Sequence, residues 1–446
     1  MDILKKIEAS EHRKIRFAIC DIDGILRSKT VSLEKFKNAL KDDISFCDVL
    51  FGWDTNDSCY DNTPFAGWHT GYPDHKARFD LSTFRTVPWE NNLPYILADF
   101  SQAGNEHVPC PRALLKRVVT QAENRGLYPD FAAEYEWYNF ADKPDELEAS
   151  GYNKLTPITP GMFGYSQLRP SQFQDYCDDL FVLMEKFGVP VESFHTETGP
   201  GVYEASLAHS HILEAADNAA LFKAGIKEIA SRYGIIASFM AKWKETLPGS
   251  GGHIHQSLRS ADRKNNLFHA ECGSLNPLFE NYLAGILVCL PEVLPMYAPT
   301  INSYKRLRLG AWAPTTVTWG YDNRTAAIRL ICSDHDSTRL EMRVPGADSN
   351  PYLAMAACLA SGLYGIKHGL KLPVPESIGN AYESTNDMHL PANLEDATMR
   401  MKNSAIAKEL FDTPFLEHFI ASREWECREY AKAVTNWELR RYLEII

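Results

Sequence analysis

The sequence predicts an α+β protein in two parts, and three observations support this prediction. The first hundred residues are rich in strand patterns, helical spacing begins after Pro109, and helices and strands then follow one another to the end. Hydrophobic residues make up 45% and charged residues 23% of the 446, which is typical of a globular protein with a large core. We place the boundary near residue 105, which gives parts 1–105 and 106–446.

The N-terminal part contains a predicted hairpin. Residues 15–33 alternate apolar and polar positions around the stretch Asp21–Gly24, a pattern typical of two strands joined by a tight turn. The same stretch also resembles the nucleophile motif of some phosphatases, but Asp-Gly is so common in hairpin turns that we favour the turn. Residues 51–86 predict loops between short strands, and residues 93–102 predict another buried strand.

The larger part contains segments with helical spacing of apolar residues. In the first of them, Leu114, Leu115, Val118 and Val119 recur at helical intervals, and the segment ends near Gly126. The predicted helices cover residues 110–127, 171–189, 212–234 and 350–370.

Charge and cysteine usage narrow the class of protein. The net charge of −12 makes nucleic acid or an anionic membrane surface a poor partner. The ten cysteines have no Cys-x-x-Cys spacing, which indicates reduced thiols in a cytosolic protein. The N-terminal sequence lacks the apolar core of a signal peptide, and no run of about 18 apolar residues predicts a membrane span. We therefore expect a cytoplasmic protein.

Charged side chains occur at alternate positions of several predicted strands. Glu134 and Glu136 share one face of their strand, because successive side chains of a strand point to opposite faces. The same rule puts His253 and His255 on one face, directly after a glycine-rich stretch that begins at Gly249. Each pattern alone is also typical of a solvated strand face.

Arginines accompany these acids. Arg339, Glu341 and Arg343 share one face of a predicted strand, and Arg324 and Arg329 lie shortly before them in the chain. The guanidinium fork binds phosphate and carboxylate groups through two hydrogen bonds. The sequence therefore provides cations for a phosphorylated or acidic substrate.

Two further glutamates, Glu197 and Glu204, bracket a Gly-Pro-Gly turn that can bring their carboxylates together. With the acids and histidines above, they offer mostly oxygen ligands and one or two imidazoles. Such a ligand set suits a hard divalent ion such as Mg²⁺ or Mn²⁺. The combination, rather than any single motif, supports this interpretation.

Taken in order, these motifs resemble the glutamine synthetase superfamily over nearly the whole chain. The stretches that carry the resemblance are 134–137 (EYEW), 197–204 (ETGPGVYE), 249–258 (GSGGHIHQSL), 302–314 (NSYKRLRLGAWAP), 323–330 (NRTAAIRL) and 339–366, which begins RLEMRVP. The resemblance implies a small N-terminal β-grasp domain and a large catalytic domain whose antiparallel sheet lines a funnel. It also implies a homo-oligomer of stacked rings, commonly a dodecamer, in which the N-terminal domain of a neighbouring subunit closes each active site.

The resemblance also implies roles for individual residues. One metal ion would be held by Glu136, Glu197 and Glu204, and the other by Glu134, His253 and Glu341. The nucleotide would contact Glu192, His255, Ser257, Arg329 and Arg339. Glutamate or its developing phosphate would contact Gly249, Arg306, Arg324 and Arg343, and Arg324 would also count among the catalytic residues.

The chain departs from the family pattern where the amine would bind. The family's flap carries a glutamate in Pro-Gly-x-Glu-x-Pro, and this position is Trp312 here. An indole offers an apolar face and one donor, but no charge for ammonium and no base for its proton. The family's N-terminal Phe-Asp-Gly-Ser-Ser is replaced by FGWDTNDSCYD, in which Asp54 or Asp57 would keep the catalytic role of binding the amine.

Together with the resemblance, these departures predict a ligase that joins the γ-carboxylate of L-glutamate to a small alkyl or aryl monoamine. The resemblance implies that it uses ATP with two or more Mg²⁺ or Mn²⁺ ions and forms a γ-glutamyl phosphate. Trp312, Trp53 and Tyr165 would line the amine pocket. The alternatives are an authentic glutamine synthetase in which Trp312 only packs the flap, a γ-glutamylpolyamine synthetase, and a structural or binding protein on the same scaffold. The presence of all six candidate metal ligands argues against the last.

Overall fold

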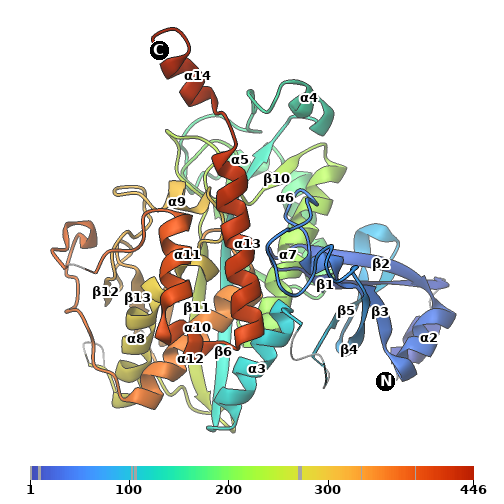
Figure 1. The fold of residues 1–446 in the computed structure, drawn as a ribbon, viewed down its shortest axis with the longest axis horizontal. Coiled ribbons are helices and arrows are strands. Elements are labelled where there is room, and N and C mark those ends of the chain that lie inside the picture. The colour runs from blue at the N-terminus through green and yellow to red at the C-terminus, as the bar shows by residue number, and fades with distance from the viewer. Residues whose placement is uncertain are drawn as a thin grey trace.

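The protein consists of two packed units, as the computed structural model shows (Figure 1). The structure describes residues 3–8, 12–101, 104, 108–269, 274–332, 334–386 and 388–446. The α+β class is confirmed, since each unit combines a sheet with helices. The predicted boundary at residue 105 lies outside the described residues and stays a prediction.

The N-terminal unit is built on a five-stranded sheet in the order β2-β1-β5-β4-β3. Its elements are α1 (Ile3–Glu8), β1 (Lys14–Cys20), β2 (Leu26–Ser32), α2 (Leu33–Asp42), β3 (Ile44–Cys47), β4 (Asp74–Val87) and β5 (Leu93–Asp99), with 3₁₀ turns Asp48–Phe51 and Pro88–Glu90. Strand β1 is antiparallel to β2 and parallel to β5, and Phe36 of α2 packs on Phe79 of β4.

The predicted hairpin is confirmed, because β1 and β2 pair in register on either side of the turn. Asp21 accepts hydrogen bonds from the backbone N–H groups of Asp23 and Ile25, and Gly24 has a φ of 87° that favours glycine. Asp23 pairs with the buried guanidinium of Arg423 at 2.5 Å. Both aspartates therefore hold the turn and its contact with the larger unit.

Residues 74–87 contradict the prediction of loops between short strands, because they form the single long strand β4. Its pairing with β5 shifts register between Asp80 and Arg85, where the strand bulges. The bulge interrupts the alternation of polar and apolar residues, so a period of two does not run through the strand.

The larger unit is built on a nine-stranded sheet in the order β12-β13-β14-β11-β6-β8-β7, with β9 and β10 paired to β6. Its strands are β6 (Leu127–Phe140), β7 (Val191–Thr196), β8 (Val202–Leu207), β9 (Ser210–His211), β10 (Ile236–Ser238), β11 (Gly252–Ser260), β12 (Trp319–Tyr321), β13 (Ile328–Ile331) and β14 (Arg339–Met342). The expected antiparallel pairing holds for these strands except between β12 and β13, which run parallel.

Helices pack against this sheet (Figure 1). They are α3 (Pro111–Glu123), α4 (Pro144–Ala149), α5 (Leu168–Ser171), α6 (Gln174–Lys186), α7 (Ile212–Arg232), α8 (Pro277–Cys289), α9 (Ser303–Arg306), α10 (Pro351–His368), α11 (Leu394–Asn403), α12 (Ala405–Leu410), α13 (Thr413–Ala431) and α14 (Asn436–Tyr442), with 3₁₀ turns Leu290–Glu292, Leu294–Met296 and Ala381–Glu383. The four predicted helices are confirmed as α3, α6, α7 and α10. In the described part of the chain, no helix has the length and apolarity needed to span a membrane.

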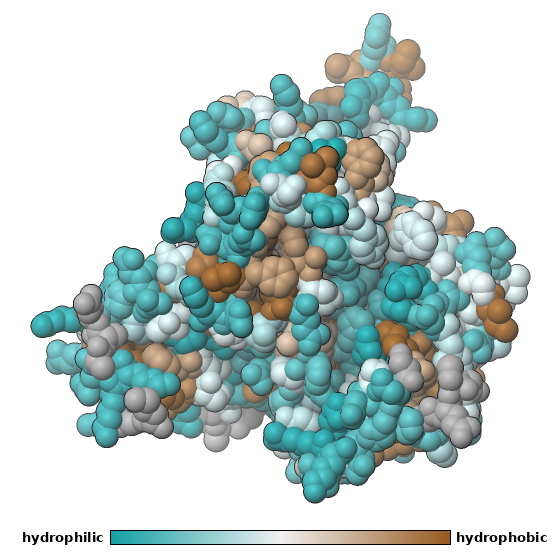
Figure 2. Space-filling model, turned by 180° about the vertical axis from the view of Figure 1, so that it is seen from behind, coloured by the Kyte–Doolittle hydropathy of each residue, from teal (hydrophilic) through white to brown (hydrophobic). Residues whose placement is uncertain are grey.

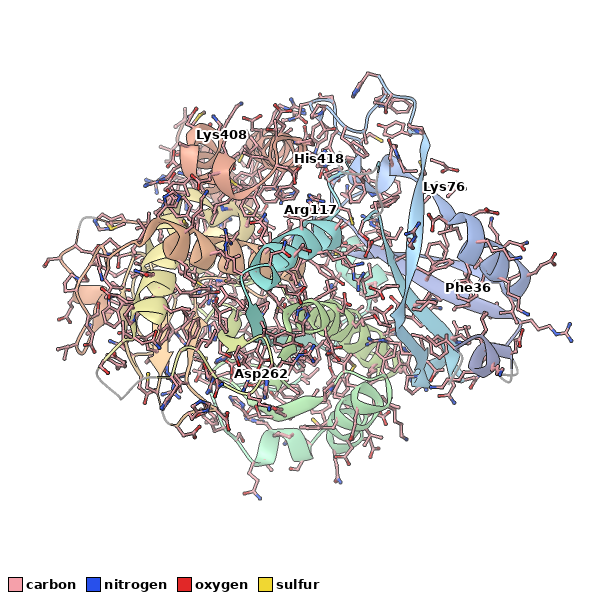
Figure 3. All side chains as sticks on the ribbon, turned by 90° about the horizontal axis from the view of Figure 1, so that it is seen from below. Phe36, Lys76, Arg117, Asp262, Lys408 and His418 are labelled. Carbon is pink, nitrogen blue, oxygen red and sulfur yellow. The ribbon has the colours of Figure 1, made fainter. Side chains whose placement is uncertain are left out.

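Two further buried contacts join the units. The guanidinium of Arg112 at the start of α3 donates hydrogen bonds to Asp80 and Asp99 of the N-terminal sheet and to Asp217 on α7. His418 of α13 lies where the C-terminal helices meet the N-terminal unit, edge-on to Phe65 with ring centroids 6.2 Å apart (Figure 3). The N-terminal sheet is thus fixed against the larger unit.

We expect Arg112→Met to destabilise the protein by about 3–5 kcal/mol, because it leaves buried carboxylates without their cation. Burial favours the neutral acid, but Arg112 outweighs it and lowers the pKa of Asp99. The contribution of these ion pairs to the free energy of unfolding is therefore present above the ordinary carboxyl pKa and is lost as the pH falls below about 4. Urea unfolding at several pH values measures both effects.

Arg117→Met on the same helix is the matched control. Its single ion pair with Asp412 is about a third exposed, so we expect a loss of less than about 1 kcal/mol. Equal losses for the two variants would show that Arg112 does not join the units.

Candidate active site

One face of the large sheet collects the charged residues that the sequence singled out, because cross-strand register pairs them. The pairs are Glu134–His253, Glu136–Glu204, His255–Glu341 and Arg329–Glu341. Directly opposite residues have Cβ atoms only about 5 Å apart. The charged residues predicted to share a face of β6, β11 or β14 therefore also lie next to those of the neighbouring strands.

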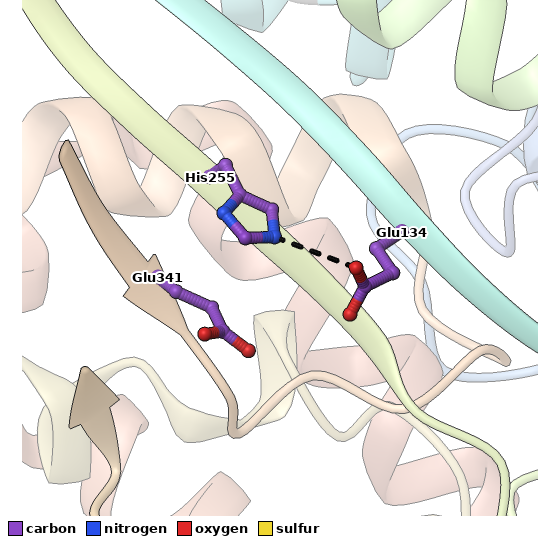
Figure 4. Close-up of side chains that lie close together, drawn as sticks. All are labelled: Glu134, His255 and Glu341. Carbon is purple, nitrogen blue, oxygen red and sulfur yellow. Dashed lines mark ion pairs between the residues drawn. The ribbon is translucent and has the colours of Figure 1, made fainter. Parts of the chain in front are cut away.

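A first acid–histidine cluster lies on β6, β11 and β14. The Nδ1 atom of His253 is 3.0 Å from an oxygen of Glu134 and 3.4 Å from one of Glu341. His255 Nε2 is 3.8 Å from the other oxygen of Glu134 (Figure 4). Ligand atoms of Glu134, His255 and Glu341 lie within 4.8 Å of one another, which fits one cation. Both histidines thus lie at this cluster, and the predicted metal role of His253 stays a prediction.

A second cluster contains Glu197, Glu204 and a residue that the sequence reasoning missed, His195. Their ligand atoms also lie within 4.8 Å of one another. The signal was present in the sequence, because His195 precedes Glu197 by two residues, the spacing that places side chains on one side of an extended chain. Glu136, the third predicted ligand, lies opposite Glu204, but one of its oxygens accepts a hydrogen bond from the N–H of Gly251 at 2.6 Å.

Electrostatics favour cations at both clusters. Burial and the neighbouring charges of Glu134 and Glu136 raise the pKa of Glu204 to about 10. Burial alone would also raise the pKa of Glu341, but Arg343 and His253 outweigh it and lower that pKa to about 2. The face therefore holds more carboxylates than its arginines neutralise, and divalent ions with oxygen and imidazole ligands fit this donor set.

All four residues predicted for glutamate line a cavity of about 450 Å³ over the second cluster: Gly249, Arg306, Arg324 and Arg343. We call it the glutamate cavity after that prediction. Arg306 is buried and held by the backbone carbonyls of Val344 and Arg343, while Arg324 is exposed. A Cβ atom at position 249 would come within 2.5 Å of the Ala241 carbonyl, so the close chain approach requires glycine.

The residues predicted for the nucleotide line a second cavity of about 660 Å³, with one exception. Glu192, His255, Ser257 and Arg339 are there, and Arg339 donates to Nδ1 of His255 at 3.2 Å. Arg329 instead lines the glutamate cavity, 2.9 Å from Glu341. The cavities share Glu134, Ser193 and Ser206 and therefore adjoin one another.

Trp312 lies at the border between the glutamate cavity and a larger outer cavity of about 1120 Å³. Its backbone has a φ of 56°, and 64% of the residue is exposed. The carboxylates that line the glutamate cavity in the described chain come only from the two clusters and Glu136. The position where the family carries its flap glutamate thus presents an indole.

Trp53, Asp54 and Asp57 do not line this cavity within the described part of their own chain. Asp54 is engaged in its loop, where it accepts from two backbone N–H groups and from Nε1 of Trp425 at 2.8 Å. Asp57 is 57% exposed and pairs with Arg27. Their predicted roles at the amine site stay predictions.

The fold and the site define a class of enzyme that holds a nucleotide beside paired acid–histidine clusters, with an arginine-lined cavity for an acidic substrate. Residues 108–442 match the family model described as "Glutamine synthetase, catalytic domain". The chain belongs to the glutamine synthetase family and is an ATP-dependent ligase that joins glutamate to ammonia or an amine.

Three known proteins illustrate the range of this likeness. "Type-1 glutamine synthetase 2" of Dictyostelium discoideum is 47% identical, over 100% of this chain and 86% of its own length. "Glutamate--isopropylamine ligase" of Pseudomonas sp is 38% identical, over 99% of this chain and 97% of its own. A solved structure described as "GmaS/ADP complex-Conformation 1" superposes with a TM-score of 0.85 at 25% identity, over 99% of each chain.

We expect cation binding near neutral pH to release about one proton, because Glu204 is protonated below a pKa of about 10 and a cation ligand must be ionised. Apparent affinity should therefore rise with pH up to that value. Titration calorimetry with Mn²⁺ in two buffers of different ionisation enthalpy measures the proton. Glu204→Gln should abolish the release, and identical heats for the wild-type protein in both buffers would contradict the expectation.

Proposed function

We propose that the protein joins the γ-carboxylate of L-glutamate to a small organic monoamine and produces a γ-glutamylamide, ADP and phosphate. The observation that carries this proposal is the indole of Trp312 at the mouth of the glutamate cavity, in the place of a carboxylate. An apolar face favours an alkyl or aryl group over ammonium, whose charge an indole neither neutralises nor deprotonates.

The residues of the two cavities suggest the order of bond changes. A γ-carboxylate oxygen of glutamate attacks the γ-phosphorus of ATP, and ADP leaves. The neutral amine then attacks the acyl carbon of γ-glutamyl phosphate, phosphate leaves, and the nitrogen loses one proton to the departing phosphate or to solvent. Arg306 and Arg343 would hold glutamate, while Arg339 and Arg329 would face the phosphates. Bound Mg²⁺ or Mn²⁺ at the two clusters would neutralise phosphate charge.

An aspartate from a neighbouring copy would complete the acceptor end, and Asp57 suits this role better than Asp54. Asp54 is occupied by its own loop and Trp425, whereas Asp57 has a single ion pair, with Arg27, and is 57% exposed.

Association of copies is supported by α14, which extends from the body with exposed apolar side chains at its end (Figure 2). The stacked rings expected from the family remain part of this proposal.

Glutamine synthesis from ammonium is the second candidate, favoured by the 47% identity to a protein of that name. The discriminating experiment measures phosphate release at saturating glutamate and ATP with ammonium, methylamine, isopropylamine, aniline and putrescine. Three buried carbons add about 2 kcal/mol, so we expect kcat/KM for isopropylamine to exceed that for ammonium about 30-fold. Ammonium or putrescine as the best acceptor would overturn the proposal.

Trp312→Glu tests the indole itself. Restoring a carboxylate should move the isopropylamine-to-ammonium ratio at least about tenfold toward ammonium, because the anion stabilises a small cation and removes the apolar face. Trp312→Phe keeps an apolar ring and is the matched control, with a ratio near that of the wild-type protein. An unchanged ratio in Trp312→Glu would exclude residue 312 from acceptor selection.

Mixed oligomers test the role of Asp57. Asp57→Asn and Glu341→Gln should each lose most activity, while co-assembled copies should recover up to about a quarter of it, since random pairing leaves that share of sites intact. Asp54→Asn, which removes a loop contact, should lower thermal stability instead. The absence of recovery in verified mixed oligomers would contradict a site shared between copies.

A further inference from the structure

The imidazole of His195 lies on the same sheet face as the carboxylates of the second cluster. Strand register pairs His195 of β7 with Glu204 of β8, and Glu204 in turn with Glu136 of β6. From the sequence we expect three carboxylates, and no imidazole, around a metal ion at this cluster. The structure thus adds an imidazole nitrogen to the expected carboxylate oxygens.

The surroundings of the His195 ring indicate a ligand rather than a hydrogen-bonded residue. Its Nε2 atom is 3.4 Å from an oxygen of Glu197 and 3.5 Å from one of Glu204. This nitrogen is buried and has no hydrogen-bond partner in the described chain. A buried polar nitrogen normally has a partner, so one that faces two carboxylates without bonding to them points to a group that all three can bind. Nitrogen and carboxylate oxygen are joint ligands of divalent transition ions.

A second observation shows that the ring orientation is fixed. The phenol ring of Tyr165 stacks on the His195 imidazole with centroids 4.4 Å apart and planes within 4°. Backbone contacts hold the Tyr165 loop against β7, because the N–H of Tyr165 donates to the Thr196 carbonyl at 2.7 Å and Ser166 N–H donates to Thr196 Oγ1 at 2.9 Å. Tyr165 has a φ of 54°, a conformation that a non-glycine residue adopts only where its surroundings enforce it.

We propose that His195 is an imidazole ligand of the divalent ion bound by Glu197 and Glu204, and that Tyr165 is the positioning residue that fixes the plane of its ring. The ion at this cluster then has a nitrogen ligand, as the ion at the first cluster has from His253 or His255. A nitrogen ligand selects for Mn²⁺ over Mg²⁺, since Mg²⁺ prefers oxygen. The inference rests on the same site as the proposed function but holds for ammonium and for organic acceptors alike.

Pulsed electron paramagnetic resonance of the full-length protein loaded with Mn²⁺ tests the proposal directly, because it detects nitrogen nuclei bound to the metal. We expect imidazole nitrogen couplings from two classes of Mn²⁺ in the wild-type protein, and compare samples with ¹⁵N-labelled histidine to assign them. His195→Gln should remove one class and leave the other. His368→Gln, on the exposed end of α10, is the control and should leave both classes.

Mn²⁺ and Mg²⁺ titrations supply the second readout. His195→Gln should weaken one Mn²⁺ site by about tenfold or more and Mg²⁺ binding by less, while Tyr165→Ala should give an intermediate loss and Tyr165→Phe should retain wild-type affinity. A single nitrogen class in the wild-type protein, which needs no variant to measure, would overturn the proposal. So would unchanged Mn²⁺ affinity in a folded His195→Gln protein. These measurements do not depend on which acceptor the enzyme uses. The proposed ligand role of His195 and the proposed amine specificity can therefore be disproved independently.

Discussion

Negative charge concentrated on one face of a sheet is the constraint on which the site depends. Five carboxylates border the glutamate cavity: Glu134, Glu136, Glu197, Glu204 and Glu341. Two like charges about 4 Å apart repel by about 4 kcal/mol at an effective dielectric constant near 20, so several such pairs rival the whole stability of a domain. The repulsion raises the pKa of Glu204, so that a proton neutralises one of the charges, and cations at the two clusters would neutralise the others.

The fold keeps these charges together by packing the opposite face of the same strands. Alternate residues of β6, Tyr135 and Trp137, are buried and contact Phe222 of α7, with ring centroids 6.2 Å and 5.7 Å from it. A slip of one residue would bury Glu134 and Glu136 and expose the aromatic rings. Core packing thus fixes the register that holds the carboxylates in place.

The sequence predicted the parts of the site that follow a simple period. Alternation revealed the acids and histidines of β6, β11 and β14, and the resemblance supplied their roles. His195 was missed because the resemblance assigned this ion to three carboxylates, although the spacing of two residues between His195 and Glu197 was present in the sequence. The bulge in β4 hid a strand, and the occupation of Asp54 by Trp425 depends on a contact with α13 that local pattern does not encode. In these last two places, contacts between residues far apart in the sequence determine the structure, and local sequence patterns do not reveal such contacts.

In the proposed function, the two ends of the cavity obey different physical demands. Charge pairing would hold the phosphates at one end, whereas the size and polarity of one side chain, Trp312, would select the acceptor at the other. A structure of the protein with ADP, Mn²⁺ and γ-glutamyl isopropylamide measures this division most directly. The isopropyl group should lie against the indole of Trp312 with the metal ions at the two acid–histidine clusters. An isopropyl group directed away from Trp312, with a carboxylate beside the amide nitrogen, would contradict it.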